Sequence, residues 1–246
     1  MPATLRSAAP TQQAVLADPR LIVALDLPTR AEAEAVVEAL GDAVSFYKIG
    51  LQLFATDGMA MARDLRARGR SLFLDWKLHD IGATVEKAAA AIVGTGACDF
   101  LTVHAHPQVL KAAVKGRGGD AQAKILGVTV LTSLNGQDLA EMGYGMGVEA
   151  LVERRIRQVQ DAGADGVVAS PHEAAMARRI GGPDFLVVTP GVRPDWAGKD
   201  DQARAATPAE TLANGASHLV VGRPITAAAD PREAALRIAA EMRGLD

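Results

Sequence analysis

The chain has 246 residues, of which 49% are hydrophobic and 22% are charged, so it can bury a large core. This length is long for an ordinary domain but normal for a single α/β barrel. The formal net charge of -3 gives no electrostatic signal for nucleic acid, and no apolar stretch approaches the length of a membrane span. The single cysteine, Cys98, excludes an internal disulfide and fits the reducing cytoplasm.

Residues 1–19 lack the continuous apolar segment of a secretory signal, so we expect a flexible N-terminal extension followed by one catalytic domain over residues 20–246. From Leu21 onward, short apolar runs alternate with helical patterns, which is typical of parallel βα units. The predicted strands are Leu21–Leu25, Ser45–Ile49, Leu72–Asp75, Phe100–Val103, Ile125–Val130, Gly166–Ala169, Phe185–Thr189 and His218–Val221.

The junctions between these elements repeat. Gly96, Gly163 and Gly215 each fit a glycine helix stop just before a strand. Helix starts with an N-cap, a proline and a glutamate are predicted at Ser170–Glu173, Thr207–Glu210 and Asp230–Glu233. A repeated βα pattern without a domain linker favours a single (β/α)8 TIM barrel over an open doubly wound sheet.

The stretch SLFLDWKLHDIGATV, residues 71–85, places charged groups directly after an apolar run. Strand alternation points Asp75 and Lys77 to the same side and Trp76 to the core. Asp80 follows in the connecting loop, and a helical run begins after Gly82. Two acids around one lysine suggest a site with opposed charges, although a structural ion-pair network is the alternative.

Active sites of such barrels lie at the carboxyl ends of the strands. Polar residues gather there in this sequence: Asp26, Lys48, Asp75, Lys77, His104, Thr132, Ser133, Arg193, Gly222 and Arg223. Charged residues that close apolar strands cost desolvation unless they pair or serve chemistry. Thr132 and Ser133 fit either a turn or a ligand contact. His104 and His106 alternate without a clear carboxylate partner, so we assign no metal.

The loops after strands seven and eight predict a phosphate site. Gly222 lets the backbone approach closely, Arg223 offers a bidentate fork, and Arg193 and Gln202 can close from the preceding loop. The alternative reading of Arg223 is a solvated turn residue. Neither a Walker loop nor a dinucleotide fingerprint is present, and no cofactor is predicted.

From about Leu21 to its C-terminus, the sequence resembles the orotidine 5'-phosphate decarboxylase family. The motifs that carry the resemblance are ALDLP at Asp26, FYKIG at Lys48, DxKxxDI at Asp75, Lys77 and Asp80, LTS at Thr132, TPGVR at Arg193, the following Gln202, and VVGRPI at Gly222 and Arg223. One departure is Gly82, where the family usually has proline.

The resemblance implies decarboxylation of orotidine 5'-phosphate to UMP and CO₂ in pyrimidine biosynthesis, with Lys77 as the proton donor to C6. It implies an alternating array of Lys48, Asp75, Lys77 and Asp80, in which Asp80 and Thr84 reach into the neighbouring subunit of a homodimer.

The family pattern also divides the remaining residues by role. It implies ribose contacts from Asp26 and Lys48, base recognition near Thr132 and Ser133, and phosphate binding by Arg193, Gln202, Gly222 and Arg223. We expect a cytoplasmic enzyme that contacts neither nucleic acid nor membrane.

Two other functions compete with this interpretation. A metal-dependent sugar-phosphate aldolase or decarboxylase of the same barrel type shares the DxKxxD segment and often has glycine where this chain has Gly82. Such enzymes are expected to carry an acidic metal ligand where this chain has Lys48. A non-catalytic phosphate-binding barrel is the second alternative, but it has little use for a buried proton donor.

Overall fold

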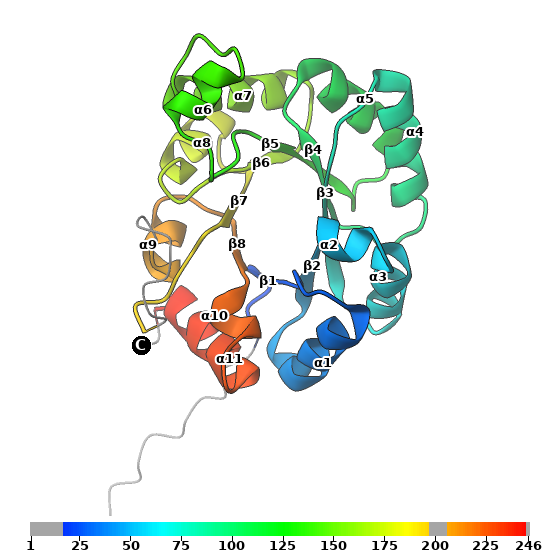
Figure 1. Ribbon diagram of the computed structural model, residues 1–246, viewed down its shortest axis with the longest axis vertical. Coiled ribbons are helices and arrows are strands. Elements are labelled where there is room, and N and C mark those ends of the chain that lie inside the picture. The colour runs from blue at the N-terminus through cyan, green and yellow to red at the C-terminus, as the bar shows by residue number, and fades with distance from the viewer. Residues whose placement is uncertain (1–16, 197–205, 245–246) are drawn as a thin grey trace, which may run out of the picture.

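Eight parallel strands close into a barrel in the computed structural model, which describes residues 17–196 and 206–244 (Figure 1). The strands are β1 (Leu21–Ala24), β2 (Phe46–Gly50), β3 (Ser71–Leu78), β4 (Phe100–His104), β5 (Lys124–Val128), β6 (Gly166–Val168), β7 (Leu186–Pro190) and β8 (His218–Val221). Strands that follow one another in sequence pair in space, and β8 closes onto β1. The predicted (β/α)8 TIM barrel is therefore confirmed.

Helices surround the strands and cover the outside of the barrel (Figure 1). They are α1 (Arg30–Leu40), the 3₁₀ helix η1 (Gly41–Ala43), α2 (Leu51–Phe54), α3 (Gly58–Ala67), α4 (Gly82–Val93), α5 (Pro107–Arg117), α6 (Gly136–Glu141), α7 (Val148–Asp161), α8 (Ala174–Gly181), α9 (Pro208–Ala213), α10 (Arg223–Thr226) and α11 (Pro231–Met242). Within the described ranges, none of them is long and apolar enough to cross a membrane.

The helix boundaries follow local chemistry in most places. Gly96, Gly163 and Gly215 have φ angles of 67°, 71° and 101°, so each ends its helical segment in the left-handed conformation that glycine tolerates best. Thr207 and Asp230 cap α9 and α11 by accepting a backbone N–H with their side chains, as predicted.

The helix start predicted at Ser170 is wrong, because α8 begins only at Ala174. The Ser170 N–H donates to the Glu173 carboxylate at 2.8 Å, and the Glu173 N–H donates to the Ser170 carbonyl at 3.0 Å. These two bonds close a separate turn before the helix, so the local cap motif serves the turn instead.

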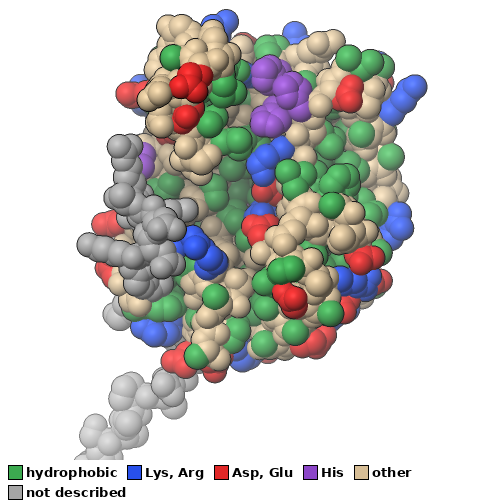
Figure 2. Space-filling model, in the orientation of Figure 1, with side chains coloured by type: hydrophobic (Ala, Val, Ile, Leu, Met, Phe, Trp, Pro, Cys, Tyr) green, Lys and Arg blue, Asp and Glu red, His purple; other side chains and the backbone are tan. Residues whose placement is uncertain are grey.

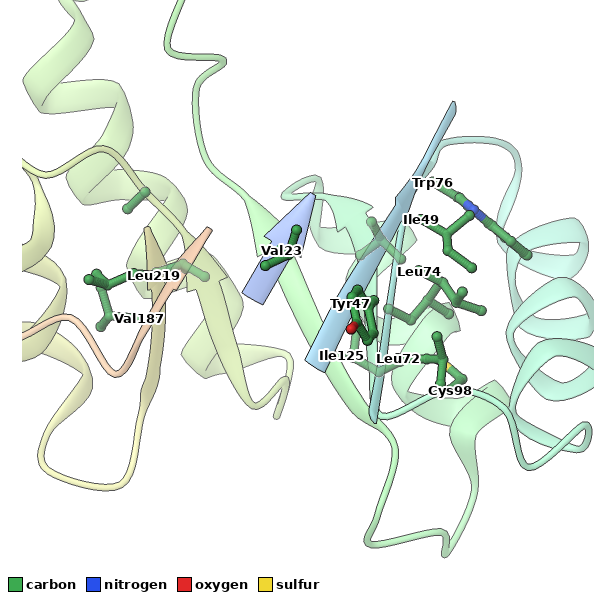
Figure 3. Close-up of a cluster of buried hydrophobic side chains, with 14 of the residues drawn as sticks. Val23, Tyr47, Ile49, Leu72, Leu74, Trp76, Cys98, Ile125, Val187 and Leu219 are labelled. Carbon is green, nitrogen blue, oxygen red and sulfur yellow. The ribbon is translucent and has the colours of Figure 1, made fainter. Parts of the chain in front are cut away.

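The core has two parts because successive strand residues face opposite sides of the sheet. The larger part packs between the strands and the helices, and Figure 3 shows its members Tyr47, Leu74 and Trp76. The smaller part fills the barrel interior and consists of Ile22, Ala24, Phe46, Phe73, Phe100, Leu126, Val188 and Val220. The barrel is thus a packed support, not a pore.

Asp18, just before the first strand, packs against the barrel. Asp18 is only 3% exposed and pairs with Arg20 at 2.8 Å and with Arg243 at 3.4 Å. This carboxylate therefore ties the entry of the first strand to the C-terminal end of the described chain. The rest of the predicted extension, residues 1–16, lies outside the described residues.

Candidate active site

The inward-facing side chains change from apolar to charged toward the carboxyl ends of the strands. Phe46 is followed two residues later by Lys48 in β2, and Phe73 is followed by Asp75 in β3. Since the strand period is two, the apolar floor and the charged layer above it belong to the same inner face. The sequence alternation therefore places the charged groups directly on a packed support.

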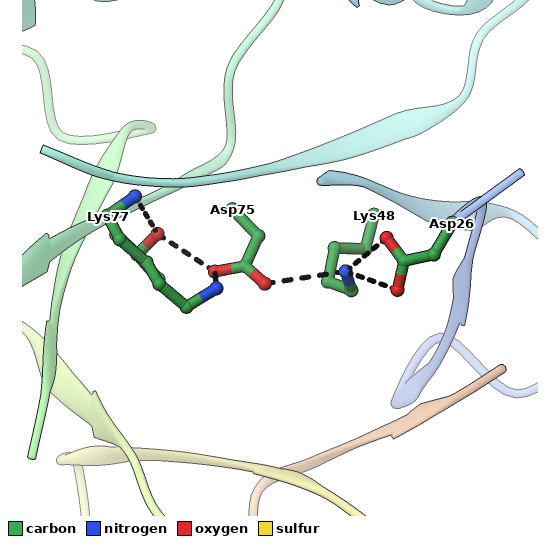
Figure 4. A network of polar contacts seen from close by, with 5 residues as sticks. Asp26, Lys48, Asp75 and Lys77 are labelled. Atoms are coloured by element: carbon green, nitrogen blue, oxygen red, sulfur yellow. Dashed lines mark hydrogen bonds and ion pairs between the residues drawn. The ribbon is translucent and has the colours of Figure 1, made fainter. Parts of the chain in front are cut away.

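Four charged side chains from three consecutive βα units form a chain of contacts (Figure 4). The Lys48 ammonium lies 2.9 Å and 3.0 Å from the two Asp26 carboxylate oxygens and 3.3 Å from Asp75 Oδ2. The Lys77 ammonium donates to Asp75 Oδ1 at 2.9 Å. The positive and negative groups therefore alternate along this chain of contacts, and Asp75 and Lys77 meet as their spacing in the strand predicted.

Asp75 is the central carboxylate of this array, with 13% of its side chain exposed. Burial by itself would raise the pKa of Asp75. The opposing charges of Lys48 and Lys77, together with hydrogen bonds from Lys77 and Thr102, outweigh burial and hold this pKa below its ordinary value. Asp75 is therefore ionised at neutral pH, between two cations.

The backbone of Lys77 has an unusual conformation. Its φ of 48° is the only positive φ of a non-glycine residue in the described parts of the chain. The pairing of β3 with β4 shifts register between Leu74 and Leu78, so the strand is irregular at this point. Residues with a Cβ disfavour the left-handed region, and such conformations concentrate at functional sites.

The hydroxyl of Thr102 joins this network from β4, and Thr102 was not among the site residues predicted from the sequence. Thr102 is fully buried, its Oγ1 accepts the Lys77 N–H at 3.0 Å, and its hydroxyl donates to Asp75 Oδ1 at 3.0 Å. The sequence did contain one indication of this role: Thr102 is a hydroxyl residue between Phe100 and His104, on the face of the strand that points into the barrel. Threonine is common in strands, so that signal was weak.

The array lines one side of a cavity of about 460 Å³ at the carboxyl ends of the strands. Figure 2 shows this face with charged side chains gathered at its centre. The predicted site residues that line the cavity are Asp26, Lys48, Asp75, Lys77, Thr132, Arg193, Gly222 and Arg223. The volume suits a small polar molecule, and both the lysines and the arginines line the space that it would occupy.

Among the described residues, three of the predicted site residues do not line this cavity. Ser133 is exposed beside Thr132 and does not line it. Asp80 and Thr84 are exposed on the outer surface, and Asp80 instead lines a separate shallow hollow with His106. Gln202 lies outside the described residues.

Comparison with known proteins agrees with this arrangement. Residues 19–238 match the family described as "Orotidine 5'-phosphate decarboxylase / HUMPS family". The chain belongs to this family. A protein named orotidine 5'-phosphate decarboxylase from Caulobacter sp. (strain K31) is 68% identical over 229 residues, which cover 93% of this chain and 99% of that protein. A protein of the same name from Caulobacter vibrioides (strain NA1000 / CB15N) is 66% identical over 93% of this chain and 99% of its own length.

A solved structure supports the family assignment at the level of the fold. The crystal structure of orotidine 5'-phosphate decarboxylase from Lactobacillus acidophilus superposes with a TM-score of 0.81 and 37% sequence identity. The match covers 92% of this chain and 99% of that one.

Gly82, where the orotidine 5'-phosphate decarboxylase family usually has proline, lies at the start of a helix with room for a side chain. Gly82 is the first residue of α4, after Ile81 at the N-cap. A Cβ at Gly82 would meet Gln108 and Ala112 no closer than 3.6 Å, which is ordinary van der Waals contact. The first helical position is also where proline fits best, so glycine and the family's usual proline suit the same backbone.

Three histidines gather beside the cavity. The ring of His79 lies 4.6 Å from that of His106 and 5.2 Å from that of His104, measured between centroids. Burial and the nearby Arg155 lower the pKa of His106 to about 4, so it is neutral at physiological pH. Within the described residues, no trio of histidine, cysteine or acidic side chains is arranged to hold a metal ion.

Proposed function

We propose that this chain is an orotidine 5'-phosphate decarboxylase that converts orotidine 5'-phosphate to UMP and CO₂ in pyrimidine biosynthesis. The relatives that are 66% and 68% identical over nearly their full lengths carry that name. The observation that carries the proposal is the Lys77 ammonium, held 2.9 Å from Asp75 in a cavity that Arg193 and Arg223 also line.

Lys77 is the central residue of the proposed chemistry. Loss of CO₂ from C6 of the pyrimidine leaves an electron pair in the plane of the ring, where it cannot delocalise into the π system. A positive charge beside C6 stabilises this developing carbanion directly. Lys77 supplies that charge and then transfers a proton to C6, so it acts as stabiliser and as general acid.

Asp75 and Lys48 set the electrostatics around that proton donor. The lowered pKa of Asp75, which burial opposes and the two lysines produce, keeps a negative charge beside the substrate carboxylate that departs. This repulsion disfavours the bound substrate and is relieved when CO₂ leaves. Lys48 contacts Asp75 and Asp26 together, and we assign Asp26 and Lys48 to the ribose.

The arginines that line the cavity suit the phosphate. We assign the phosphate to Arg193, Gly222, Arg223 and Gln202, and the base to the neighbourhood of Thr132 and Ser133. Arginine matches phosphate geometry with two parallel donors. The binding energy of the phosphate is used to orient the base against Lys77. This contact therefore raises kcat and does not only lower KM.

The metal-dependent sugar-phosphate reaction is the main competing function. Such a reaction needs carboxylates that are free to bind a cation. In this site the Lys48 ammonium lies within 3.3 Å of both Asp26 and Asp75, and Lys77 pairs with Asp75 as well, so two lysines already balance the charge of these two carboxylates. The donor set therefore favours a metal-independent decarboxylation.

The test is decarboxylation of orotidine 5'-phosphate, followed by ultraviolet absorbance with and without a chelator. We expect the chelator to have no effect and Lys77→Ala to lower kcat by at least about 10⁴-fold, because it removes both the charge and the proton. Circular dichroism checks that the variant stays folded. An enzyme that is inert without Mg²⁺, or active without Lys77, would refute the proposal.

A homodimer with composite sites is part of the proposed function. Asp80 and Thr84 are exposed on the β3–α4 connection and its helix, away from their own cavity. Ile81 between them is 68% exposed, which is unusual for a large apolar side chain. We assign Asp80 and Thr84 to the site of the neighbouring subunit, where they complete the array of Lys48, Asp75 and Lys77.

We place this activity in the cytoplasm and expect neither nucleic acid nor membrane as a partner. Burial raises the pKa of the single thiol, Cys98, to about 12, so it stays protonated and inert in the core.

A further inference from the structure

We infer that Thr102 is a positioning residue that fixes the Lys77 ammonium against Asp75, an inference that rests on the proposed function of that site. Thr102 lies in β4, and none of its side chain is exposed. It does not line the substrate cavity, so it acts through its two neighbours in β3 and not by touching the substrate.

The three residues form a closed set of hydrogen bonds. The Lys77 N–H donates to Thr102 Oγ1 at 3.0 Å, and the Thr102 hydroxyl donates to Asp75 Oδ1 at 3.0 Å. The Lys77 ammonium donates to the same Asp75 oxygen at 2.9 Å. One hydroxyl therefore connects the backbone of the proton donor with the carboxylate that holds its side chain.

The backbone of Lys77 explains why such a group is needed. The register shift between Leu74 and Leu78 interrupts the regular pairing of β3 with β4, and Lys77 adopts a φ of 48° at the interruption. A side-chain oxygen then replaces the strand carbonyl as the acceptor for the Lys77 N–H. The left-handed conformation is unfavourable for lysine and persists only when surrounding contacts hold it.

A second buried threonine provides a control that distinguishes the positioning role of Thr102 from ordinary packing. Thr189 of β7 is also fully buried, but its hydroxyl has no hydrogen-bond partner among the described residues. A buried threonine in this barrel thus does not require hydroxyl contacts in order to pack. Thr189→Val is therefore the matched control for Thr102→Val, because valine keeps the shape of threonine and removes only the hydroxyl.

The test compares kcat, KM and the pH profile of Thr102→Val, Thr102→Ser and Thr189→Val. We expect Thr102→Val to lower kcat by about 10- to 100-fold with a smaller change in KM, because a misplaced catalytic group loses orientation. Thr102→Ser restores the hydroxyl and should recover most of kcat. Thr189→Val should match the wild type.

The pH dependence gives a readout that packing alone would not move. Lys48 from β2 and Lys77 from β3 face Asp75, and Asp26 lies behind Lys48. The Thr102 hydroxyl stabilises ionised Asp75, so its loss raises the pKa of this carboxyl. If activity requires ionised Asp75, it is lost on acidification when this carboxyl becomes protonated. This loss should occur at a higher pH in Thr102→Val than in the wild type.

Titration of the Asp75 carboxyl by ¹³C NMR without substrate keeps this inference separate from the proposed function. A raised Asp75 pKa in Thr102→Val supports the inference even if the wild type proves inactive on orotidine 5'-phosphate. If Thr102→Val fails to fold, Thr102→Cys, with a weakly hydrogen-bonding thiol, is measured in the same way. An unchanged kcat and Asp75 titration, no recovery in Thr102→Ser, or an equal loss in Thr189→Val would overturn the inference.

Discussion

Lys48 is a buried cation that contacts two carboxylates, and it connects the halves of the charged array. Only 6% of Lys48 is exposed, and its ammonium lies within 3.3 Å of Asp26 and Asp75. Taking one such ion out of water costs several kcal/mol unless opposite charges compensate. Asp26 and Asp75 supply this compensation, so the protein itself holds Lys48 in its charged form within the array.

Gly50 leaves the space that this arrangement occupies. A Cβ at Gly50 would lie 2.4 Å from Asp26 Oδ1 and 3.1 Å from the Lys48 ammonium. We expect Gly50→Ala to displace the Asp26 carboxylate and to lower kcat/KM by about 10- to 100-fold, as misplacement of a binding group by about 1 Å does. Steady-state kinetics on orotidine 5'-phosphate measures this loss.

Two comparisons sharpen the Gly50 prediction. Asp26→Ala empties the space that the new methyl group enters, so Gly50→Ala should cost little in that background. Gly136→Ala, which would meet no atom within 4 Å, is the control and should leave kcat/KM unchanged. Equal losses from Gly50→Ala with and without the Asp26 carboxylate would contradict the proposed contact.

At the scale of elements, β3 packs into the core on one side and contributes to the charged array on the other. Trp76 points outward and packs on Phe54 of α2 with the ring centroids 4.4 Å apart, while Asp75 and Lys77 belong to the charged array. The strand was predicted to end at Asp75 but continues to Leu78 after its register shift. The buried Trp76 thus anchors the segment that carries Asp75 and Lys77.

The helices that follow β3 and β4 pack closely through Gly116 of α5. A Cβ there would lie 2.2 Å from the Glu86 carbonyl oxygen and 3.0 Å from Ala89 Cβ of α4. Gly116→Ala gains up to about 1 kcal/mol of helix propensity but forces the helices apart, which typically costs about 1–3 kcal/mol. We expect a net loss of stability.

Thermal unfolding followed by circular dichroism measures this effect. A net loss of about 1 kcal/mol lowers Tm by about 2–4 °C in a domain of this size. Gly119→Ala, where a Cβ would meet nothing within 4 Å, is the control and should keep its Tm within about 1 °C, because exposed substitutions change stability little. A higher Tm for Gly116→Ala would show that propensity outweighs the contact.

At the scale of the whole molecule, the proposed assembly depends on residues that one subunit cannot use by itself. Asp80 lies in a hollow with His79 and Ile81, outside the cavity that contains Lys77. If Asp80 completes the neighbouring site, Asp80→Asn and Lys77→Ala damage different halves of one composite site. A mixed dimer then has one site that carries both substitutions and one that carries neither.

We therefore expect each variant to be inactive alone and the mixture to regain activity after subunit exchange. Statistical exchange makes half of the dimers mixed, and each of these has one intact site of two, so the recovery approaches about a quarter of wild-type activity. Mixing each variant with itself is the control. A mixture that exchanges subunits, as shown by mass spectrometry, but stays inactive would contradict composite sites.

Much of this arrangement could be predicted from local patterns. The bounds of β8 were predicted correctly, and the alternation of Asp75 and Lys77 agrees with their contact. The helix start at Ser170 was wrong because the same hydrogen-bonding groups close a turn there. A cap motif predicts which side chains can hydrogen-bond to nearby backbone N–H groups. Whether a helix follows depends on the residues after the motif.

The sequence by itself determined the number and parallel direction of the strands, and with them the edge at which the charged residues meet. These properties follow from hydrophobic periodicity, which is local, and from the shared direction of parallel strands. Only the tertiary structure decided that Thr102 binds Lys77 and Asp75, that Gly50 makes room for Asp26, and that Asp80 lies outside its own cavity. Such contacts depend on strand register and on side-chain direction across the barrel, which periodicity leaves open.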